Sequence, residues 1–215
     1  MKIRGMIFDM DGVVVDSMVM WRGLEPRLEA ELGIDIDEET SNLVQTMSLD
    51  ISTVFLIEKF GLDMTAEELS KYVYGIIEDY YLNRSELKEG AADILTKLSA
   101  AGKKITLATA TPRKLTEAAL SKNDVLQYFG KIYTVSEIGK GKGEPAIFET
   151  AMEWIGGPNG ETMVVEDSPV AIKTAKNAGF KVCAVYDGIN DETLDEVAEY
   201  ADLKIRSLTE LDVIL

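Results

Sequence analysis

Short apolar segments alternate with amphipathic helical patterns along most of this chain, and this alternation constrains its fold more than any other feature. It predicts a doubly wound α/β fold, with a mostly parallel sheet covered by helices on both faces. In "SPVAIKTAKNAG" we expect Ser168 to cap a helix that Pro169 begins and Gly179 ends. "TPRKLTEAALSK" follows the same pattern, with Thr111 as the expected cap. The predicted strands cover residues 3–8, 104–109, 131–136, 162–166, 181–186 and 203–206.

One long segment interrupts the alternation directly after the first strand. Residues 16–87 contain no convincing strand, and Thr65 with Glu68 forms a capping box before the last helical pattern of the segment. We therefore predict a Rossmann-like core, residues 1–15 and 88–215, with an inserted all-helical cap, residues 16–87. Insertions at this end of a sheet often cover a functional site. The predicted helices of the insertion are 17–32, a piece near 38–46, 50–60 and 66–83.

Composition excludes several classes of function. The 215 residues include no histidine, which removes Ser-His-Asp catalysis and the commonest zinc ligands. The single cysteine, Cys183, lies in a β-like apolar run and is expected to be a buried structural thiol. A formal net charge of -16 argues against nucleic acid as a partner.

The chain shows no targeting signal in its sequence. No apolar run approaches the roughly 18 residues of a membrane span, and "MKIRGMIFDM" lacks the features of a signal peptide. The expectation is a cytoplasmic protein without a membrane or nucleic-acid partner, and a monomer is the default.

Chemically active residues follow four of the predicted strands. Ligands of open α/β sheets bind at the carboxyl ends of the strands, so these residues are expected to converge. Several carboxylates cannot all stay ionised at one place without a compensating cation, and oxygen ligands suit Mg²⁺. Hydroxyls, a lysine and the N–H groups at the start of a helix suit a phosphate group. The residues concerned are Asp9, Asp11 and Gly12; Thr109, Ala110 and Thr111; Lys140 and Lys142; and Glu166 and Asp167.

Four segments together resemble the motifs of the haloacid dehalogenase-like hydrolase superfamily. They are "DMDGVVVDS", "ITLATAT", "GKGKGEPAIF" and "VVEDSPVAIKTAKNAGF", and they occur in order along essentially the whole chain. The first and fourth are specific, whereas the second and third are weak alone. The chain is most similar to the beta-phosphoglucomutase-like phosphatase subgroup, which carries a helical cap after the first motif.

The resemblance implies a role for each motif residue. Asp9 would be the nucleophile that forms an aspartyl-phosphate, and Asp11 would be the general acid and base. Mg²⁺ would be held by Asp9, the backbone carbonyl of Asp11 and Asp167, with Glu166 close by or acting through water. Thr109 would bind the transferring phosphoryl group together with Gly12, Ala110 and Thr111, and Lys142 would neutralise its charge.

Some assignments stay open at this stage. Lys140 competes with Lys142, although the family spacing of Lys, two residues and Pro fits "KGEP" from Lys142; Gly143 and Ala146 depart from that pattern. Trp21 lies on an apolar helical stripe, so it either packs in the core of the cap or faces substrate. Arg22 is a candidate substrate contact or a surface charge.

The function that this reading predicts is a Mg²⁺-dependent phosphatase of a small phosphorylated, sugar-phosphate-like metabolite. A sugar phosphomutase is the alternative, yet those relatives carry a histidine where this chain has Trp21. They also carry a lysine and an arginine in a cap loop that reads "QTMSL" here, with Gln45, Thr46 and Leu49. A non-catalytic phosphate-binding domain is a further alternative, disfavoured because every motif residue is retained.

Overall fold

The computed structural model describes residues 3–44, 49–186 and 195–214. The chain divides into two compact units, which are described separately. Unit 1 comprises residues 1–18 and 85–215, and unit 2 comprises residues 19–84. The cap-loop residues Gln45 and Thr46 lie outside the described residues. None of the helices in the described ranges combines the length and the apolar composition that a membrane crossing needs.

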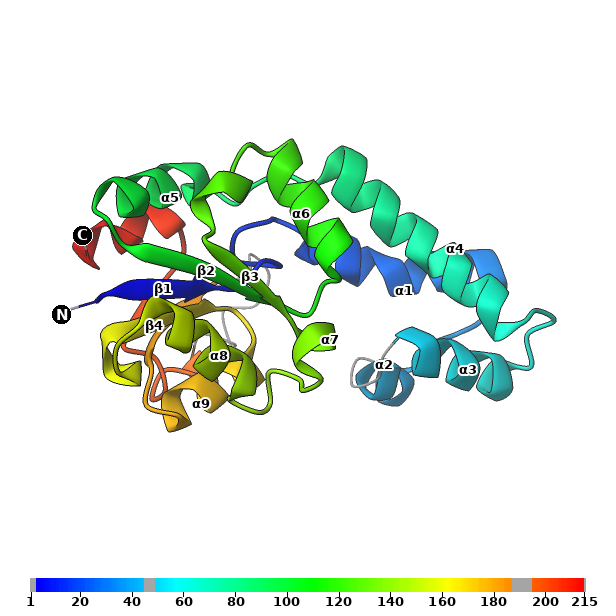
Figure 1. Cartoon of the computed structure of the whole chain (residues 1–215). Coiled ribbons are helices and arrows are strands. Elements are labelled where there is room, and N and C mark those ends of the chain that lie inside the picture. Colours follow the sequence, from blue (N-terminus) through cyan, green and yellow to red (C-terminus); the bar gives the residue numbers. More distant parts are fainter. Residues whose placement is uncertain (1–2, 45–48, 187–194, 215) are drawn as a thin grey trace. The chain divides into compact units, whose positions relative to one another are not determined.

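A parallel sheet forms the centre of unit 1 (Figure 1). In the described part of the chain it has six strands in the order β3-β2-β1-β4-β5-β6, and each neighbouring pair is parallel. The chain winds outward from β1 in one direction and from β4 in the other, so the strand order reverses between these two strands. The strands are β1 (Gly5–Phe8), β2 (Lys104–Thr109), β3 (Lys131–Thr134), β4 (Thr162–Glu166), β5 (Lys181–Val185) and β6 (Leu203–Ile205).

Helices cover both faces of the sheet, α5 and α6 on one and α8 and α9 on the other (Figure 1). Helix α8 buries Ile147, Phe148, Ala151 and Ile155, which recur at helical spacing on one side. Phe148 meets Phe180 edge to face, with ring centroids 6.2 Å apart. These helices are α5 (Ala91–Ala100), α6 (Arg113–Lys122), α7 (Val135–Ile138), α8 (Ala146–Ile155) and α9 (Pro169–Asn177), with short helical turns at Leu126–Tyr128, Asn159–Glu161 and Leu208–Ile214.

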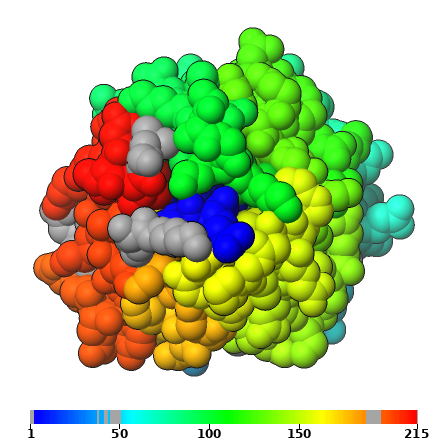
Figure 2. Space-filling model, turned by 60° about the vertical axis from the view of Figure 1, so that its left-hand side comes forward, coloured from blue at the N-terminus to red at the C-terminus, as the bar shows by residue number. Residues whose placement is uncertain are grey.

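The amino ends of the strands gather on one face of the molecule. Figure 2 shows the beginning of the chain (blue) surrounded there by the segments that lead into β2 (green) and β4 (yellow). Because the sheet is parallel, every strand ends at the opposite edge, where the predicted site residues follow β1 to β4. The predicted α/β class, with a helical segment after the first strand, is confirmed.

The predicted helix ends are partly right. Ser168 occupies the cap position of α9, Pro169 is its first residue, and Gly179 adopts φ +85° just beyond its end. The prediction that Thr111 caps α6 is wrong, because α6 begins at Arg113 with Pro112 in the cap position. The Thr111 hydroxyl donates to Asp11 Oδ2 instead, at 2.6 Å.

Unit 2 is helical throughout its described residues, as predicted. Helix α4 buries Leu69, Val73, Ile76 and Ile77 on one face. The predicted capping box is present: the Glu68 N–H donates to Thr65 Oγ1 at 3.2 Å, and the Thr65 N–H donates to Glu68 Oε2 at 2.8 Å. The elements are α1 (Met18–Leu32), α2 (Glu38–Val44), α3 (Leu49–Phe60), α4 (Ala66–Asp79) and a π-helical turn, Tyr80–Arg84.

Removing the capping box should destabilise unit 2. Thr65→Ala leaves the Glu68 N–H without its partner at an exposed helix start, so the midpoint of thermal unfolding should fall by a few degrees. Thr65→Ser keeps the hydroxyl and should unfold near the parent temperature in the same calorimetric scan. Equal midpoints for the alanine and serine variants would contradict this role.

Candidate active site

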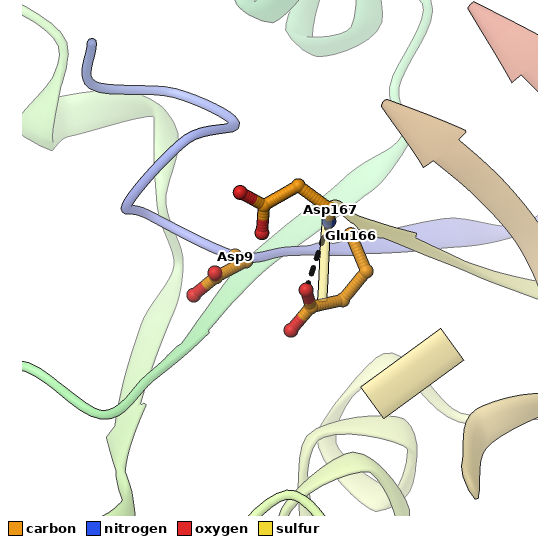
Figure 3. A group of neighbouring side chains, drawn as sticks. All are labelled: Asp9, Glu166 and Asp167. Atoms are coloured by element: carbon orange, nitrogen blue, oxygen red, sulfur yellow. Dashed lines mark hydrogen bonds between the residues drawn. The ribbon is translucent and has the colours of Figure 1, made fainter. Parts of the chain in front are cut away.

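The carboxyl ends of β1 and β4 place three carboxylates together. Phe8 pairs with Val165, and the Asp9 N–H donates to the Val165 carbonyl at 3.0 Å, so the residues that follow these strands are neighbours. Asp9, Glu166 and Asp167 each offer a carboxylate oxygen, and these oxygens lie within 4.8 Å of one another (Figure 3). The cluster stands where the strand order reverses, the usual ligand position in such sheets.

A largely buried lysine, with 13% of its side chain exposed, joins two of these carboxylates. Lys142 Nζ lies 2.5 Å from Asp9 Oδ1 and 2.6 Å from Glu166 Oε1. Lys140, the competing lysine, is exposed and pairs with Glu144 at 2.5 Å. The structure therefore brings Lys142, and not Lys140, to the carboxylate cluster.

Glu166 is fully buried, and both its carboxylate oxygens accept hydrogen bonds. Oε1 accepts from Lys142, and Oε2 accepts from the N–H groups of Asp167 and Ser168, each at 2.9 Å. The Ser168 side chain makes no capping bond, so Glu166 satisfies backbone donors at the start of α9 in its place. Glu166 thus holds both the lysine and the loop that presents Asp167.

Burial and like charge disfavour the ionised carboxylates of this cluster. Burial, followed by the charge of Glu166, raises the pKa of Asp9 from its ordinary 3.8 to about 8, against the opposing effect of Lys142. The same two causes raise the pKa of Asp167 well above its ordinary value. Burial alone would lower the pKa of Lys142, but Asp9 and Glu166 outweigh it and raise that pKa, so the lysine stays charged.

The charge balance of the cluster fits a divalent cation. When Asp9, Glu166 and Asp167 are all ionised, Lys142 balances only one of their three negative charges. All the donors are oxygens, which hard cations prefer. The three carboxylates can therefore hold a metal ion.

Asp11 is held by two hydroxyls. Ser17 Oγ donates to Oδ1 and Thr111 Oγ1 donates to Oδ2, both at 2.6 Å. Both donors are buried. The contact from Ser17 was not predicted from the sequence, although Ser17 follows Asp11 by only six residues.

The residues after β2 form a compact turn. Thr109 is buried, and its hydroxyl oxygen accepts the N–H of Thr111 at 3.0 Å. That N–H, considered above as an anion donor, is therefore hydrogen-bonded within the turn. Ala110 is exposed between the two threonines.

Gly12 allows the close approach of Asp167. It adopts φ +74°, and a Cβ at this position would lie 1.9 Å from Asp167 Oδ2. Both the backbone conformation and the space require glycine.

The two predicted cap residues belong to unit 2. Trp21 is half-buried, and its Nε1 donates to the hydroxyl of the buried Tyr81 at 3.2 Å. Arg22 is exposed. A packing role for Trp21 within unit 2 agrees with this hydrogen bond.

Comparison with known proteins places this geometry in a family. The model of the haloacid dehalogenase-like hydrolases matches residues 6–185. The chain is 23% identical over 190 residues to the phosphorylated carbohydrates phosphatase of Thermotoga maritima, covering 88% of each chain. It is 23% identical over 198 residues to the beta-phosphoglucomutase of Bacillus subtilis, covering 86% of this chain and 84% of that one.

The fold itself matches a crystal structure of a Thermotoga maritima protein. The TM-score is 0.80 at 23% identity, and the match covers 99% of this chain and 100% of that one. At this identity the likeness shows the fold alone.

Gly12→Ala should displace Asp167 and weaken metal binding. The matched control is Gly33→Ala, because Gly33 adopts φ +68° and a Cβ added there would have no atom within 4 Å. In Gly33→Ala the free energy of unfolding should fall only by the cost of the backbone conformation, about 1 kcal/mol. Gly12→Ala should lose more stability and bind Mg²⁺ at least about tenfold more weakly in calorimetric titration. Parent-like Mg²⁺ affinity in Gly12→Ala would contradict the contact.

The stability of the metal-free protein should depend on the ionisation of Asp9. The native pKa is about 8 and the ordinary value 3.8, so the stabilisation from the protonated group is complete below about pH 4. It should be lost as pH rises towards and through 8. The free energy of unfolding, measured in urea with a chelator present, should therefore fall over this range.

Asp9→Asn is the control for this pH dependence, because asparagine cannot ionise. At pH 8 without metal, the variant should be more stable than the parent by at least about 1 kcal/mol, the equivalent of less than one pKa unit. The difference should vanish near pH 4. Parallel pH profiles for the two proteins would refute the assignment.

Proposed function

The chain belongs to the haloacid dehalogenase-like hydrolase family, and we propose that it is a Mg²⁺-dependent phosphatase of a small phosphorylated metabolite. The predicted family is confirmed by the match over residues 6–185, and the enzyme class agrees with the phosphatase among its relatives. We further propose that hydrolysis proceeds through an aspartyl-phosphate intermediate and that the substrate resembles a sugar phosphate.

One observation carries the proposal more than any other. The Lys142 ammonium bridges Asp9 and Glu166 at the carboxyl edge of the sheet, beside Asp167. A largely buried lysine among three carboxylates serves no core packing. It does suit a reaction in which negative charge spreads over a transferring phosphoryl group.

Asp9 is the proposed nucleophile. One of its oxygens would attack phosphorus and form an acyl phosphate as the ester oxygen leaves. Lys142 holds the Asp9 carboxylate in place through Oδ1 and contributes positive charge beside the reacting group. The hydrogen bond from the Asp9 N–H to the Val165 carbonyl fixes the backbone of the nucleophile to the sheet.

Asp11 is the proposed proton carrier. It would donate a proton to the leaving oxygen and later accept one from the water that hydrolyses the acyl phosphate. Ser17 and Thr111 orient its carboxylate through both oxygens. Asp9 contacts Lys142, whereas Asp11 accepts hydrogen bonds from two hydroxyls. Such different surroundings suit two carboxylates to different tasks.

Asp9, Glu166 and Asp167, with the backbone carbonyl of Asp11, are the proposed metal-binding groups. Bound Mg²⁺ would supply positive charge that stabilises the transferring phosphoryl group. Thr109 and the exposed Ala110 N–H are the proposed contacts of that group, beside Gly12 and Thr111. Trp21 and Arg22 remain proposed contacts of the rest of the substrate.

A phosphomutase is the rival within the same family, and a relative has that activity. A mutase must hold a second phosphate at the far end of its intermediate, and charged donors serve that purpose best. This chain has Trp21, Gln45 and Thr46 at the cap positions compared above, none of them cationic.

Phosphate release tests the function directly. With Mg²⁺, the protein should release inorganic phosphate from para-nitrophenyl phosphate, and a chelator should stop the reaction. Asp9→Asn should lower kcat by at least about a thousandfold, because the nucleophile is lost. Malachite green detection of phosphate gives the rate.

Two outcomes would oppose the proposal. Undiminished turnover in Asp9→Asn would remove Asp9 from the nucleophile role. Accumulation of glucose 6-phosphate from β-glucose 1-phosphate, in place of free glucose and phosphate, would establish the mutase.

A further inference from the structure

Several lysines of unit 1 are bound to groups of the protein itself. Lys142 is shared by Asp9 and Glu166, and Lys140 pairs with Glu144. Lys88 Nζ donates to the Tyr186 carbonyl at 2.6 Å. These three lysines stabilise the site and its surroundings.

Arg113, at the start of α6, also forms its hydrogen bonds with groups of unit 1. Its Nη2 donates to Glu137 Oε2 and to the Ile132 carbonyl, each at 2.7 Å. The hydrogen bonds from Arg113 lower the pKa of Glu137 to about 2, so this pair stays ionised and joined. A substrate anion would have to displace a carboxylate to gain this arginine.

Unit 2 adds few positive charges and many negative ones. Residues 19–84 contain five basic and fourteen acidic residues, a formal net charge of -9. Three of the five cations pair with carboxylates of the same unit. The pairs are Arg27 with Glu31, Lys59 with Asp37 and Arg84 with Asp79.

Unit 2 contains a groove whose lining carries both positive and negative charges. A groove of about 570 Å³ between α1 and α4 is lined by Arg27, Lys71 and Arg84, together with Glu68 and Asp79. Each positive charge in this groove therefore shares it with carboxylates. An added anion would meet both signs of charge there.

Taking the proposed phosphatase function as its basis, we propose that the substrate carries one phosphate and a remainder that is uncharged or positively charged. A phosphorylated polyol or amino alcohol fits this class. Sugar bisphosphates and phosphorylated carboxylic acids do not, because the described residues offer their second anion few cations that are not already paired or shared with carboxylates.

The physical reason is electrostatic. An anion that leaves water without a partner is strongly disfavoured, and surrounding negative charge disfavours it further. The chain joins unit 2 covalently to unit 1 at residues 18–19 and 84–85, so the net negative charge of unit 2 is tethered to the unit that carries Asp9 and Lys142. Lys142 and a bound metal ion would compensate the phosphoryl group, whereas few of the described cations remain for a second anionic group.

Two substrates of equal carbon number separate the classes. Sorbitol 6-phosphate and 6-phosphogluconate differ at one end, where a hydroxymethyl group replaces a carboxylate. With saturating Mg²⁺ at low salt, kcat/KM should favour sorbitol 6-phosphate by at least about tenfold. The ratio should shrink at 0.5 M NaCl, since salt screens the repulsion. A smaller ratio at low salt, or preference for the acid, overturns the proposal.

Two further measurements distinguish failure of the substrate inference from failure of the proposed phosphatase function. Hydrolysis of para-nitrophenyl phosphate with a small polyol-to-acid ratio would overturn the inference and leave the phosphatase intact. If no ester is hydrolysed, the function fails, and calorimetric titration of the parent protein and Asp9→Asn with the two ligands still decides the inference. It stands if the polyol phosphate binds at least about tenfold more tightly, and it falls otherwise.

Two variants test the remaining cations of unit 2. Arg22→Gln and Lys71→Gln each remove one positive charge and keep a polar side chain. Each should change kcat/KM for both substrates by the same factor, so that the polyol-to-acid ratio stays constant. A selective loss on 6-phosphogluconate in either variant would identify a receptor for a second anion and refute the proposal.

Discussion

The contact of the Lys142 ammonium with Asp9 and Glu166 is the interaction on which the rest of the site depends. It joins the segment after β3 to the ends of β1 and β4, so three parts of the chain are held by one positive charge. Asp167 lies nearby as a further carboxylate, so the cluster carries more negative than positive charge when all its groups are ionised. Either protonation of Asp9 and Asp167 or a bound cation relieves the repulsion, which links metal binding to the stability of the fold.

The parallel sheet brings these charged residues together at one edge. Parallel strands end at one edge, and the strand order reverses there between β1 and β4, which is the usual ligand position in such sheets. Glu166 shows how the fold supports the chemistry: one carboxylate holds the lysine and also satisfies backbone donors at the start of α9. Gly12 completes the arrangement by leaving room for Asp167.

Charge also connects the chemistry to substrate choice. The carboxyl edge of the sheet carries Lys142 beside a carboxylate cluster that could hold a metal ion. The inserted unit is strongly acidic, and most of its cations already have partners. Under the proposal made above, these charges favour a monoester whose remainder is neutral or cationic.

The sequence by itself determined the α/β class, the order of the strands along the chain, the helical insertion, and the group of residues that meets at one edge of the sheet. These features follow from local periodicity, caps and the geometry of parallel sheets. Only the tertiary structure decided that Lys142 and not Lys140 reaches Asp9, and that Glu166 takes over the capping of α9. The tertiary structure also decided that the hydroxyls of Thr111 and Ser17 donate to Asp11. The physical reason is distance along the chain: Thr111 and Asp11 are 100 residues apart, and a hydroxyl that can cap a helix locally donates to whichever acceptor the fold brings within reach.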